Sequence, residues 1–378
     1  MTTVCFRRSP HVVAYWDERG RLVAFDYAQR ARVEVTPLIV KVMSGCGSWS
    51  SVDAVAQLLP HASLDELTLL LDKLVALRLL QRTNEPEDAT STALAQHWPT
   101  WVPEPALFHL STKDVTYRRE QPSKSQSRPP DPLKRIAGIP EMRMPAMDTS
   151  SALADVLLRR RTWRRFGRTA VGLDDISTLL GLTWGVQRWL RIRPGYRVAL
   201  KTSPSGGARH SIEVYLLALR VKGLPPGLYH FNPEACTLRQ IKDGAEPSIV
   251  STYLPTQDWY ERAAALFIMS AVFERVQWRY PYPRAYRSIL AEAGHLGQTF
   301  CLTATALSLA PFCTMAFADS RIERDLGIDG VRESVIYVTG VGTRPRKTPW
   351  TPWAYGDAKP DLAAPKRQYA THTIRESR

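Results

Sequence analysis

No apolar run in the 378-residue sequence approaches the roughly 20 residues that a membrane-spanning helix requires, so the sequence predicts no membrane partner. The first ten residues contain paired arginines but lack the apolar stretch of a signal peptide, and the expected location is the cytoplasm. Cysteine is scarce and no CxxC pair occurs, which argues against a disulfide framework or a metal site and favours reduced thiols. The five cysteines are Cys5, Cys46, Cys236, Cys301 and Cys313, and the last two are expected only to pack.

Acidic residues are outnumbered, with 50 Lys and Arg against 36 Asp and Glu and a formal net charge of +14. Such a charge suits nucleic acid, an acidic substrate or a phosphorylated cofactor, and it is equally compatible with a solvated surface. The densest basic cluster, 159–165, lies in a helical pattern beside Trp163 and Phe166. Because no nucleic-acid-binding motif accompanies it, we expect no nucleic-acid partner.

Residues 1–83 have the pattern of a small winged-helix-like module. Two strand-like runs, 12–16 and 21–25, are joined by a short turn that ends in glycine, which predicts a hairpin. Helix starts follow, and the clearest is the capping box of Ser63 and Glu66, after which leucines recur at helical spacing. A hairpin with short helices in a segment of this length is typical of winged-helix modules.

Proline, serine and charge dominate residues 84–150, which predict a linker or clamp arm. Within it, residues 113–135 have too few apolar side chains to offset the entropy lost on ordering, and they are the best candidate for disorder. At the other end of the chain, residues 346–378 form a basic C-terminal tail.

Residues 151–345 predict a second compact unit of the α/β (α+β) class. Strand-like apolar runs lie between helical patterns, and a long amphipathic helix is expected at 285–309. Helices bracketing strands in this way predict three layers, with helices flanking a mixed sheet. The other expected elements are helices at 152–165 and 173–189 and strands at 212–221, 227–231, 237–241, 265–272 and 334–342.

Four motifs occur in order within this unit. They are Arg160-Arg161-Thr162-Trp163-Arg164, Pro204-Ser205-Gly206-Gly207, Pro226-Gly227-Leu228-Tyr229 and, in the long helix, Glu292-Ala293-Gly294-His295. Together they resemble the nitroreductase superfamily, and within it the SagB-type dehydrogenases, which oxidise thiazoline and oxazoline rings in ribosomally made peptides. The resemblance implies a nitroreductase-like fold, flavin mononucleotide (FMN) as the cofactor, and a homodimer with the flavin at its interface.

The chemistry of the motif residues agrees with a flavin site. Guanidinium forks of Arg160 and Arg161 can hold the phosphate, and Thr162 adds a hydroxyl, although such a run is otherwise a solvated face. The segment Ser205-Gly206-Gly207 lacks bulky side chains, so its N–H groups can lie against the flavin ring system; a plain turn is the alternative. The other residues expected at the cofactor are Arg164, Pro204, Gly294, His295 and Arg344, with a structural role for His295.

Arg279 and Tyr280 are the candidates for proton transfer in the sequence. In the azoline-oxidising relatives a Lys-Tyr pair lies before the long helix, and deprotonation of the ring carbon needs such a base. The matching positions here hold Arg279 and Tyr280, and arginine is a poor general base because it stays protonated. Either Tyr280 carries out the proton transfer beside the positive charge of Arg279, or the enzyme does not oxidise azolines; two plain surface residues are the third interpretation.

The leading hypothesis is therefore an FMN-dependent dehydrogenase that converts azolines to azoles in a precursor peptide, assisted by cyclodehydratase partner proteins. The alternatives are another FMN-dependent redox reaction on a peptide or small metabolite, such as reduction of a dehydroamino acid or another desaturation, and a non-catalytic peptide-binding scaffold. In peptide-modifying enzymes a winged-helix module can bind a leader peptide as an extra strand beside its hairpin. DNA binding is the alternative for residues 1–83, but their leucine-rich helix carries few basic residues.

Overall fold

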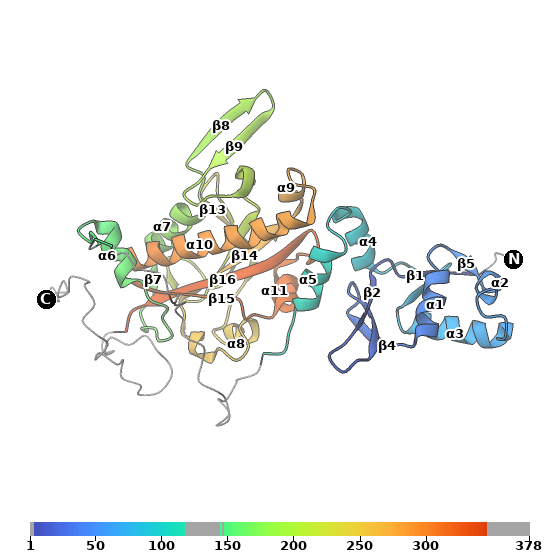
Figure 1. Cartoon of the computed structure of the whole chain (residues 1–378). Coiled ribbons are helices and arrows are strands. Elements are labelled where there is room, and N and C mark those ends of the chain that lie inside the picture. Colours follow the sequence, from blue (N-terminus) through green and yellow to red (C-terminus); the bar gives the residue numbers. More distant parts are fainter. Residues whose placement is uncertain (1–3, 118–143, 146, 346–378) are drawn as a thin grey trace.

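The computed structural model describes residues 4–117, 144–145 and 147–345, and Figure 1 shows their arrangement. The first part is a small module with two three-stranded sheets, in the strand orders β5-β1-β6 and β2-β3-β4. The expected hairpin is confirmed as β2 and β3, and the capping box of Ser63 and Glu66 opens α3 as predicted. The module's elements are β1 (Cys5–Arg8), β2 (Val12–Trp16), β3 (Leu22–Asp26), β4 (Ala31–Glu34), α1 (Pro37–Gly45), β5 (Ser50–Ser51), α2 (Val52–Ala56), α3 (Leu64–Ala76) and β6 (Leu80–Arg82).

Two helices follow the module, α4 (Ala89–His97) and α5 (Glu104–Thr112), and lie inside the segment that the sequence gives as a linker or clamp arm. Leu94 and Leu110 of these helices are buried, whereas Phe108 of α5 is exposed. Trp98 and Trp101, which lie between the helices, are fully buried in the same core as the central sheet of the second unit. We call residues 89–113 the arm. Most of the segment expected to be disordered, and the basic tail, lie outside the described residues.

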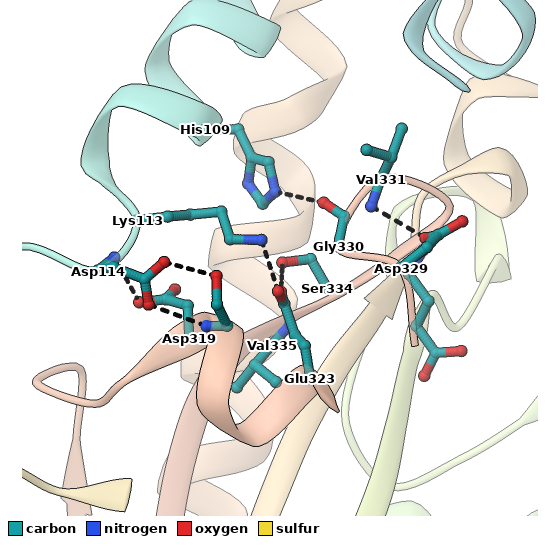
Figure 2. A network of polar contacts seen from close by, with 12 residues as sticks. His109, Lys113, Asp114, Asp319, Glu323, Asp329, Gly330, Val331, Ser334 and Val335 are labelled. Atoms are coloured by element: carbon teal, nitrogen blue, oxygen red, sulfur yellow. Dashed lines mark hydrogen bonds and ion pairs between the residues drawn. The ribbon is translucent and has the colours of Figure 1, made fainter. Parts of the chain in front are cut away.

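A buried polar network attaches the arm to the second unit, as Figure 2 shows. The Lys113 ammonium lies 2.6 Å from a carboxylate oxygen of Glu323, and both side chains are almost fully buried. His109 lies between the Tyr286 hydroxyl, at 3.0 Å, and the Gly330 carbonyl, at 3.1 Å. Burial, with the charge of Lys113 acting in the same direction, lowers the pKa of His109 to about 3. The imidazole is therefore neutral at physiological pH, and it donates to the Gly330 carbonyl and accepts from Tyr286.

The second unit is built on a six-stranded sheet in the order β13-β12-β10-β14-β16-β15. Neighbouring strands in this sheet pair antiparallel. A short parallel pair, β7 (Val171–Gly172) with β11 (Val221–Lys222), lies apart from it. The sheet strands are β10 (Ile212–Ala218), β12 (Gly227–Asn232), β13 (Thr237–Asp243), β14 (Ala265–Val272), β15 (Leu309–Thr314) and β16 (Glu333–Thr343).

Strand β14 shows why the fold has three layers. Its residues are buried on both faces, and successive side chains point to opposite sides of a sheet. Phe267 belongs to the core under α7 (Leu173–Trp184) and α10 (Tyr286–Ala306), whereas Ile268 belongs to the core under α8 (Ile249–Tyr253) and α11 (Asp319–Leu326). Figure 1 shows α10 across one face of the sheet and α8 on the other side. The expected three-layer α/β class is thus confirmed.

Two expected helices end early. The helix expected at 152–165 is α6 (Ala152–Arg159), because Arg160 takes an extended conformation as its C-cap. The helix expected at 173–189 ends at Trp184, because Gly185 leaves the helical conformation, and the hairpin β8 (Arg188–Arg193) and β9 (Tyr196–Leu200) follows. This hairpin projects from the body in Figure 1. Within the described residues, no helix is both long enough and apolar enough to cross a membrane.

Candidate functional site

The loop Pro204–Gly207 is held to α10 by a buried carboxylate. Glu292, on the sheet-facing side of α10, is 3% exposed and accepts hydrogen bonds from the Ser205 hydroxyl at 2.8 Å and the Ser211 hydroxyl at 3.0 Å. The Ser205 hydroxyl oxygen in turn accepts the His210 N–H at 2.9 Å, and His295 Nδ1 lies 3.3 Å from the Pro204 carbonyl oxygen. The loop is therefore held at Pro204 and Ser205, and its glycines remain exposed.

The two glycines of this loop allow a tyrosine to approach closely. Gly207 has φ of +61°, and a Cβ atom there would lie 2.8 Å from the Tyr280 hydroxyl oxygen. A Cβ on Gly206 would lie 3.9 Å from the Tyr280 ring and 3.5 Å from Ser288. A side chain at position 207 is thus disfavoured both by the backbone conformation and by the tyrosine. The structure brings Tyr280 together with the glycine loop, although the two are far apart in the sequence.

Arg279 does not share this close contact. Its side chain is exposed, and its guanidinium carbon lies 6.0 Å from the centroid of the Tyr280 ring. Gly294 is exposed on α10, and a Cβ there would meet nothing within 4 Å. At this end of α10, Pro204 to Gly207, His295 and Tyr280 form one group, to which Arg279 and Gly294 are peripheral.

Replacing Glu292 by glutamine is expected to destabilise the protein by about 1–3 kcal/mol, because a neutral amide accepts the two serine hydroxyls less strongly and also brings a buried N–H₂ group that needs a partner. Urea unfolding of the two proteins measures the difference. Glu274→Gln, which changes an exposed carboxylate nearby, is the control and should cost less than about 0.5 kcal/mol. Equal stability of the Glu292 variant and the wild type would show that the carboxylate does not hold the loop.

Charged residues that the sequence interpretation missed lie behind the loop. Burial lowers the pKa of Lys201, three residues before Pro204, and the charges of Glu213 and Glu292 offset only part of this. Burial would raise the pKa of Glu213, but the hydrogen bond from His230 and the charge of Arg275 outweigh it and lower that pKa to about 2. The nearness of Lys201 to the Pro-Ser-Gly-Gly motif was a usable signal, whereas Glu213 belongs to a strand pattern that indicates only burial.

A second group lies at the opposite end of α10. The Arg344 guanidinium donates to the Leu309 carbonyl at 3.0 Å and the Thr305 carbonyl at 3.4 Å, and lies 5.5 Å from the Trp163 ring centroid. Burial lowers the pKa of Arg344, and the positive charge of Arg159 lowers it further. Arg159 is already paired with Asp155 at 2.7 Å, and a further anion such as a phosphate would stabilise the two guanidinium groups more.

The other motif arginines are placed differently. Arg160 is the C-cap of α6, and Arg161 Nη1 donates to the carbonyls of Leu158 at 2.8 Å and Arg160 at 2.7 Å. Thr162 lies in the same extended segment, and it is partly buried. Arg164 lines a cavity of about 470 Å³ together with Asp258, Trp259 and Pro345. The structure therefore places Arg344 beside Trp163 and within reach of the charge of Arg159, while Arg164 lines a cavity that Pro345 also borders.

The two groups are not contiguous within one chain. The glycine loop packs near Glu292, and Arg344 contacts Thr305, so about 20 Å of α10 separates them at 1.5 Å per residue. Each group suits one part of a flavin nucleotide: the cationic one a phosphate, the glycine loop a flat ring.

Comparison with known proteins gives a consistent picture. The profile described as the nitroreductase family matches residues 157–343. A protein of Methanocaldococcus jannaschii named as a nitroreductase is 30% identical over 176 residues, which cover 47% of this chain and 84% of that protein. The trifolitoxin-processing protein TfxB of Rhizobium leguminosarum bv. trifolii is 34% identical over 142 residues, but these cover only 36% of this chain and 38% of TfxB.

Two solved structures are also similar. A protein of Anabaena variabilis assigned as a nitroreductase shares 30% sequence identity, covers 51% of this chain and 38% of its own, and superimposes with a TM-score of 0.44. The Escherichia coli microcin synthetase McbBCD complex with truncated pro-MccB17 contains a chain with 18% identity and a TM-score of 0.40, covering 76% of this chain and 96% of that chain.

Proposed function

Because this chain belongs to the nitroreductase family, we propose that it is an FMN-dependent oxidoreductase that acts on a ribosomally synthesised peptide and oxidises thiazoline or oxazoline rings to thiazole or oxazole. The observation that carries the proposal is the closeness of Tyr280 to the glycine loop, because a tyrosine hydroxyl can act as an acid–base group and the loop offers an exposed surface without bulky side chains that suits a flat ring. The similarity to a trifolitoxin-processing protein supports a peptide substrate.

The flavin, when bound, would take up a hydride from the azoline, and the chain's residues would hold it and manage the proton. Arg344, which lies beside Trp163, and the motif arginine Arg160 would supply positive charge for the phosphate, and Thr162 would add a hydroxyl. The backbone of Ser205 to Gly207, exposed and without bulky side chains, provides a flat surface for the ring system. The Tyr280 hydroxyl, which lies against Gly207, would carry the proton removed from the ring carbon.

A homodimer is part of the proposal, because one chain keeps the cationic group and the glycine loop apart. Helix α6 has no buried residue, and its apolar side chains are largely exposed, with Leu153 at 62% and Leu157 at 47%. The β8–β9 hairpin exposes Leu190 and Ile192 in the same way. A second copy that covers these surfaces would let the glycine loop of one chain and Arg160 of the other hold the same cofactor. Light scattering of the purified protein tests this.

For the N-terminal module we propose leader-peptide binding. In the sheet β2-β3-β4 the outer strands each pair on one side only, so an extended peptide can add to an edge by main-chain hydrogen bonds. The β2 edge exposes Trp16, which is 71% exposed and available as an apolar contact. Cyclodehydratase partners, which would form the azolines, belong to the same proposal.

Arg279 favours a second candidate. Because it stands where the azoline-oxidising relatives have lysine, the same site could serve another flavin-dependent reaction, such as reduction of a dehydroamino acid. The two are separated by incubating the protein with an azoline-containing peptide and with a dehydroamino acid peptide. Loss of two hydrogens per ring supports azoline oxidation, and gain of two hydrogens by the second peptide supports the alternative. A non-catalytic scaffold would leave both peptides unchanged.

The visible absorption spectrum of the purified protein tests the cofactor before any substrate is known. Flavin bands, with FMN identified after denaturation, are expected. A colourless protein that also fails to take up added FMN would contradict the proposed redox function and favour a scaffold.

Replacing Arg160 and Arg161 together by alanine is expected to release the flavin, because the proposed phosphate site would lose the positive charge of the two motif arginines. Loss of charge-assisted hydrogen bonds of about 1.5–3 kcal/mol each corresponds to at least a tenfold weaker affinity for FMN. Gel filtration followed by flavin absorbance measures the retained cofactor. Arg168→Ala, at an exposed arginine in the same segment, is the control, and full retention in the double variant would move the phosphate site elsewhere.

A further inference from the structure

The turn that follows the glycine loop contains left-handed backbone at residues other than glycine. Gly207 has φ of +61°, and Ala208 and His210 have φ of +51° and +44°. This conformation is unfavourable for a residue with a Cβ atom, and it persists only where surrounding contacts hold it. Such strained turns are common at functional sites, so the contacts that hold this one are of interest.

Arg209, in the middle of the turn, holds the carbonyl groups of both glycines. Its main-chain N–H donates to the Gly206 carbonyl at 3.3 Å, and its guanidinium Nε donates to the Gly207 carbonyl at 3.0 Å. In a planar trans peptide the N–H points opposite to the carbonyl, so the Gly207 N–H faces away from the Gly206 carbonyl. Within the described chain this N–H has no acceptor, and it remains available to a ligand.

Aromatic side chains from two other segments hold the Arg209 guanidinium in place. Its Nη2 donates to the hydroxyl of Tyr196, on β9, at 2.8 Å. Its central carbon lies 5.3 Å from the centroid of the Tyr196 ring and 5.1 Å from that of Trp278, and these two rings are 6.0 Å apart. A guanidinium close to aromatic faces is further stabilised by cation–π attraction. Arg209 therefore joins the glycine loop to the hairpin and to the segment before Tyr280.

The position of Tyr280 depends on the same loop. Its N–H donates to the Val276 carbonyl at 2.9 Å, so Tyr280 ends the helical turn that carries Trp278. Its hydroxyl forms no hydrogen bond with any residue that the structure describes, and it lies against Gly207, where a Cβ atom would be 2.8 Å away. Packing on the Gly207 backbone therefore determines where the hydroxyl lies.

We propose that Arg209 is a positioning residue for the reaction at this site. By holding the Gly207 carbonyl it fixes the loop surface against which the Tyr280 hydroxyl lies, and its effect on the reaction passes through these two residues. The inference rests on the proposed function and adds a residue to which the motifs assign no role. A positioning effect of this kind disappears when the positioned group is absent, whereas a general structural effect does not.

The first test is a double-mutant cycle on the full-length protein with its flavin, using a synthetic peptide that contains one thiazoline. Arg209→Gln is expected to lower kcat about 10- to 100-fold on its own, but less than about twofold when Tyr280→Phe is already present. Flavin content should stay unchanged in all four proteins. Arg209→Lys should recover part of the loss, because lysine can donate to the Gly207 carbonyl but cannot reproduce the planar fork.

Arg197→Gln is the matched control. Arg197 lies on the same strand as Tyr196, and its guanidinium carbon is 3.9 Å from the centroid of the Trp189 ring. The substitution removes the same charge and a similar stacking contact without touching the glycine loop, so kcat should stay within about twofold of the wild type.

The second test needs no turnover. Hydrogen exchange with mass spectrometry measures the segment 205–210, in which the Ala208 N–H donates to the Ser205 carbonyl at 3.0 Å and the His210 N–H to the Ser205 hydroxyl at 2.9 Å. Loss of a charge-assisted hydrogen bond should make these amides exchange at least about tenfold faster in Arg209→Gln than in the wild type.

Equal exchange of this segment in the two proteins would overturn the proposal. Equal losses of kcat with and without the Tyr280 hydroxyl would overturn it as well, because they would indicate a general structural role. A wild-type protein that shows the exchange difference but leaves the thiazoline unchanged would refute the proposed reaction instead and support the effect of Arg209 on the loop.

Discussion

Turnover is expected to fall about 100- to 10,000-fold when Tyr280 is replaced by phenylalanine, the range that a positioned acid–base group contributes. The change removes one oxygen atom and keeps the ring that packs against Gly206 and Gly207. The glycine loop should therefore keep its conformation, and the flavin should remain bound. The measurement is kcat on the peptide substrate together with the flavin content of the same sample.

Tyr282→Phe is the matched control, because this tyrosine is two residues away and 48% exposed, and its ring centroid lies 6.0 Å from that of Tyr280. It should leave kcat within about twofold. A Tyr280→Phe variant with unchanged kcat would remove Tyr280 from the mechanism. Loss of flavin in that variant would assign Tyr280 a binding role instead.

Replacing Lys113 by methionine should destabilise the protein by about 3 kcal/mol, because breaking a buried ion pair leaves the remaining charge without its partner. Glu323 is 6% exposed, and among the described residues it would keep the Ser334 hydroxyl and the Val335 N–H as donors (Figure 2). The double variant Lys113→Met with Glu323→Gln should recover a large part of the loss, because it removes the uncompensated charge. Urea unfolding of both variants gives the two free energies.

Lys242→Met is the control for this prediction. Lys242 pairs with Asp325 on the same helix α11, but it is 53% exposed, and exposed pairs contribute about 0–1 kcal/mol. If the Lys113 and Lys242 variants lose the same stability, the buried pair does not hold the arm more firmly than a surface pair would.

Local signals in the sequence predicted local structure well. The capping box of Ser63 and Glu66 and the hairpin at 12–16 and 21–25 appear as expected, because each depends on neighbouring residues only. The long helix near 285–309 also appears, because its apolar face repeats over several turns. Helix ends were less certain, since leaving the helix at Arg160 and Gly185 depends on what the next segment packs against.

The site was predictable as a set of motifs but not as a geometry. The Pro-Ser-Gly-Gly segment and Tyr280 were both selected, yet their contact depends on a long-range fold that brings η1 (Gly206–Ala208) against the start of α10. The hydrogen bond from Ser205 to Glu292 could not be predicted from the sequence for the same reason. Conversely, the run of arginines suggested one phosphate site, but in the structure these arginines have different environments. Arg161 caps its own helix, and Arg164 lines a different cavity.

The arm limits where this chain can be shortened without exposing its core. Trp98 donates to the Val331 carbonyl at 2.8 Å and packs on Phe273, while His109 bridges Tyr286 at the start of α10 and Gly330 before β16. A gene shortened to begin at residue 150 would keep the whole family match but leave an open apolar hollow where two tryptophans belong. Such a fragment would lose the tryptophans that fill this part of its core. A boundary drawn from the family match alone would therefore separate residues that share one hydrophobic core.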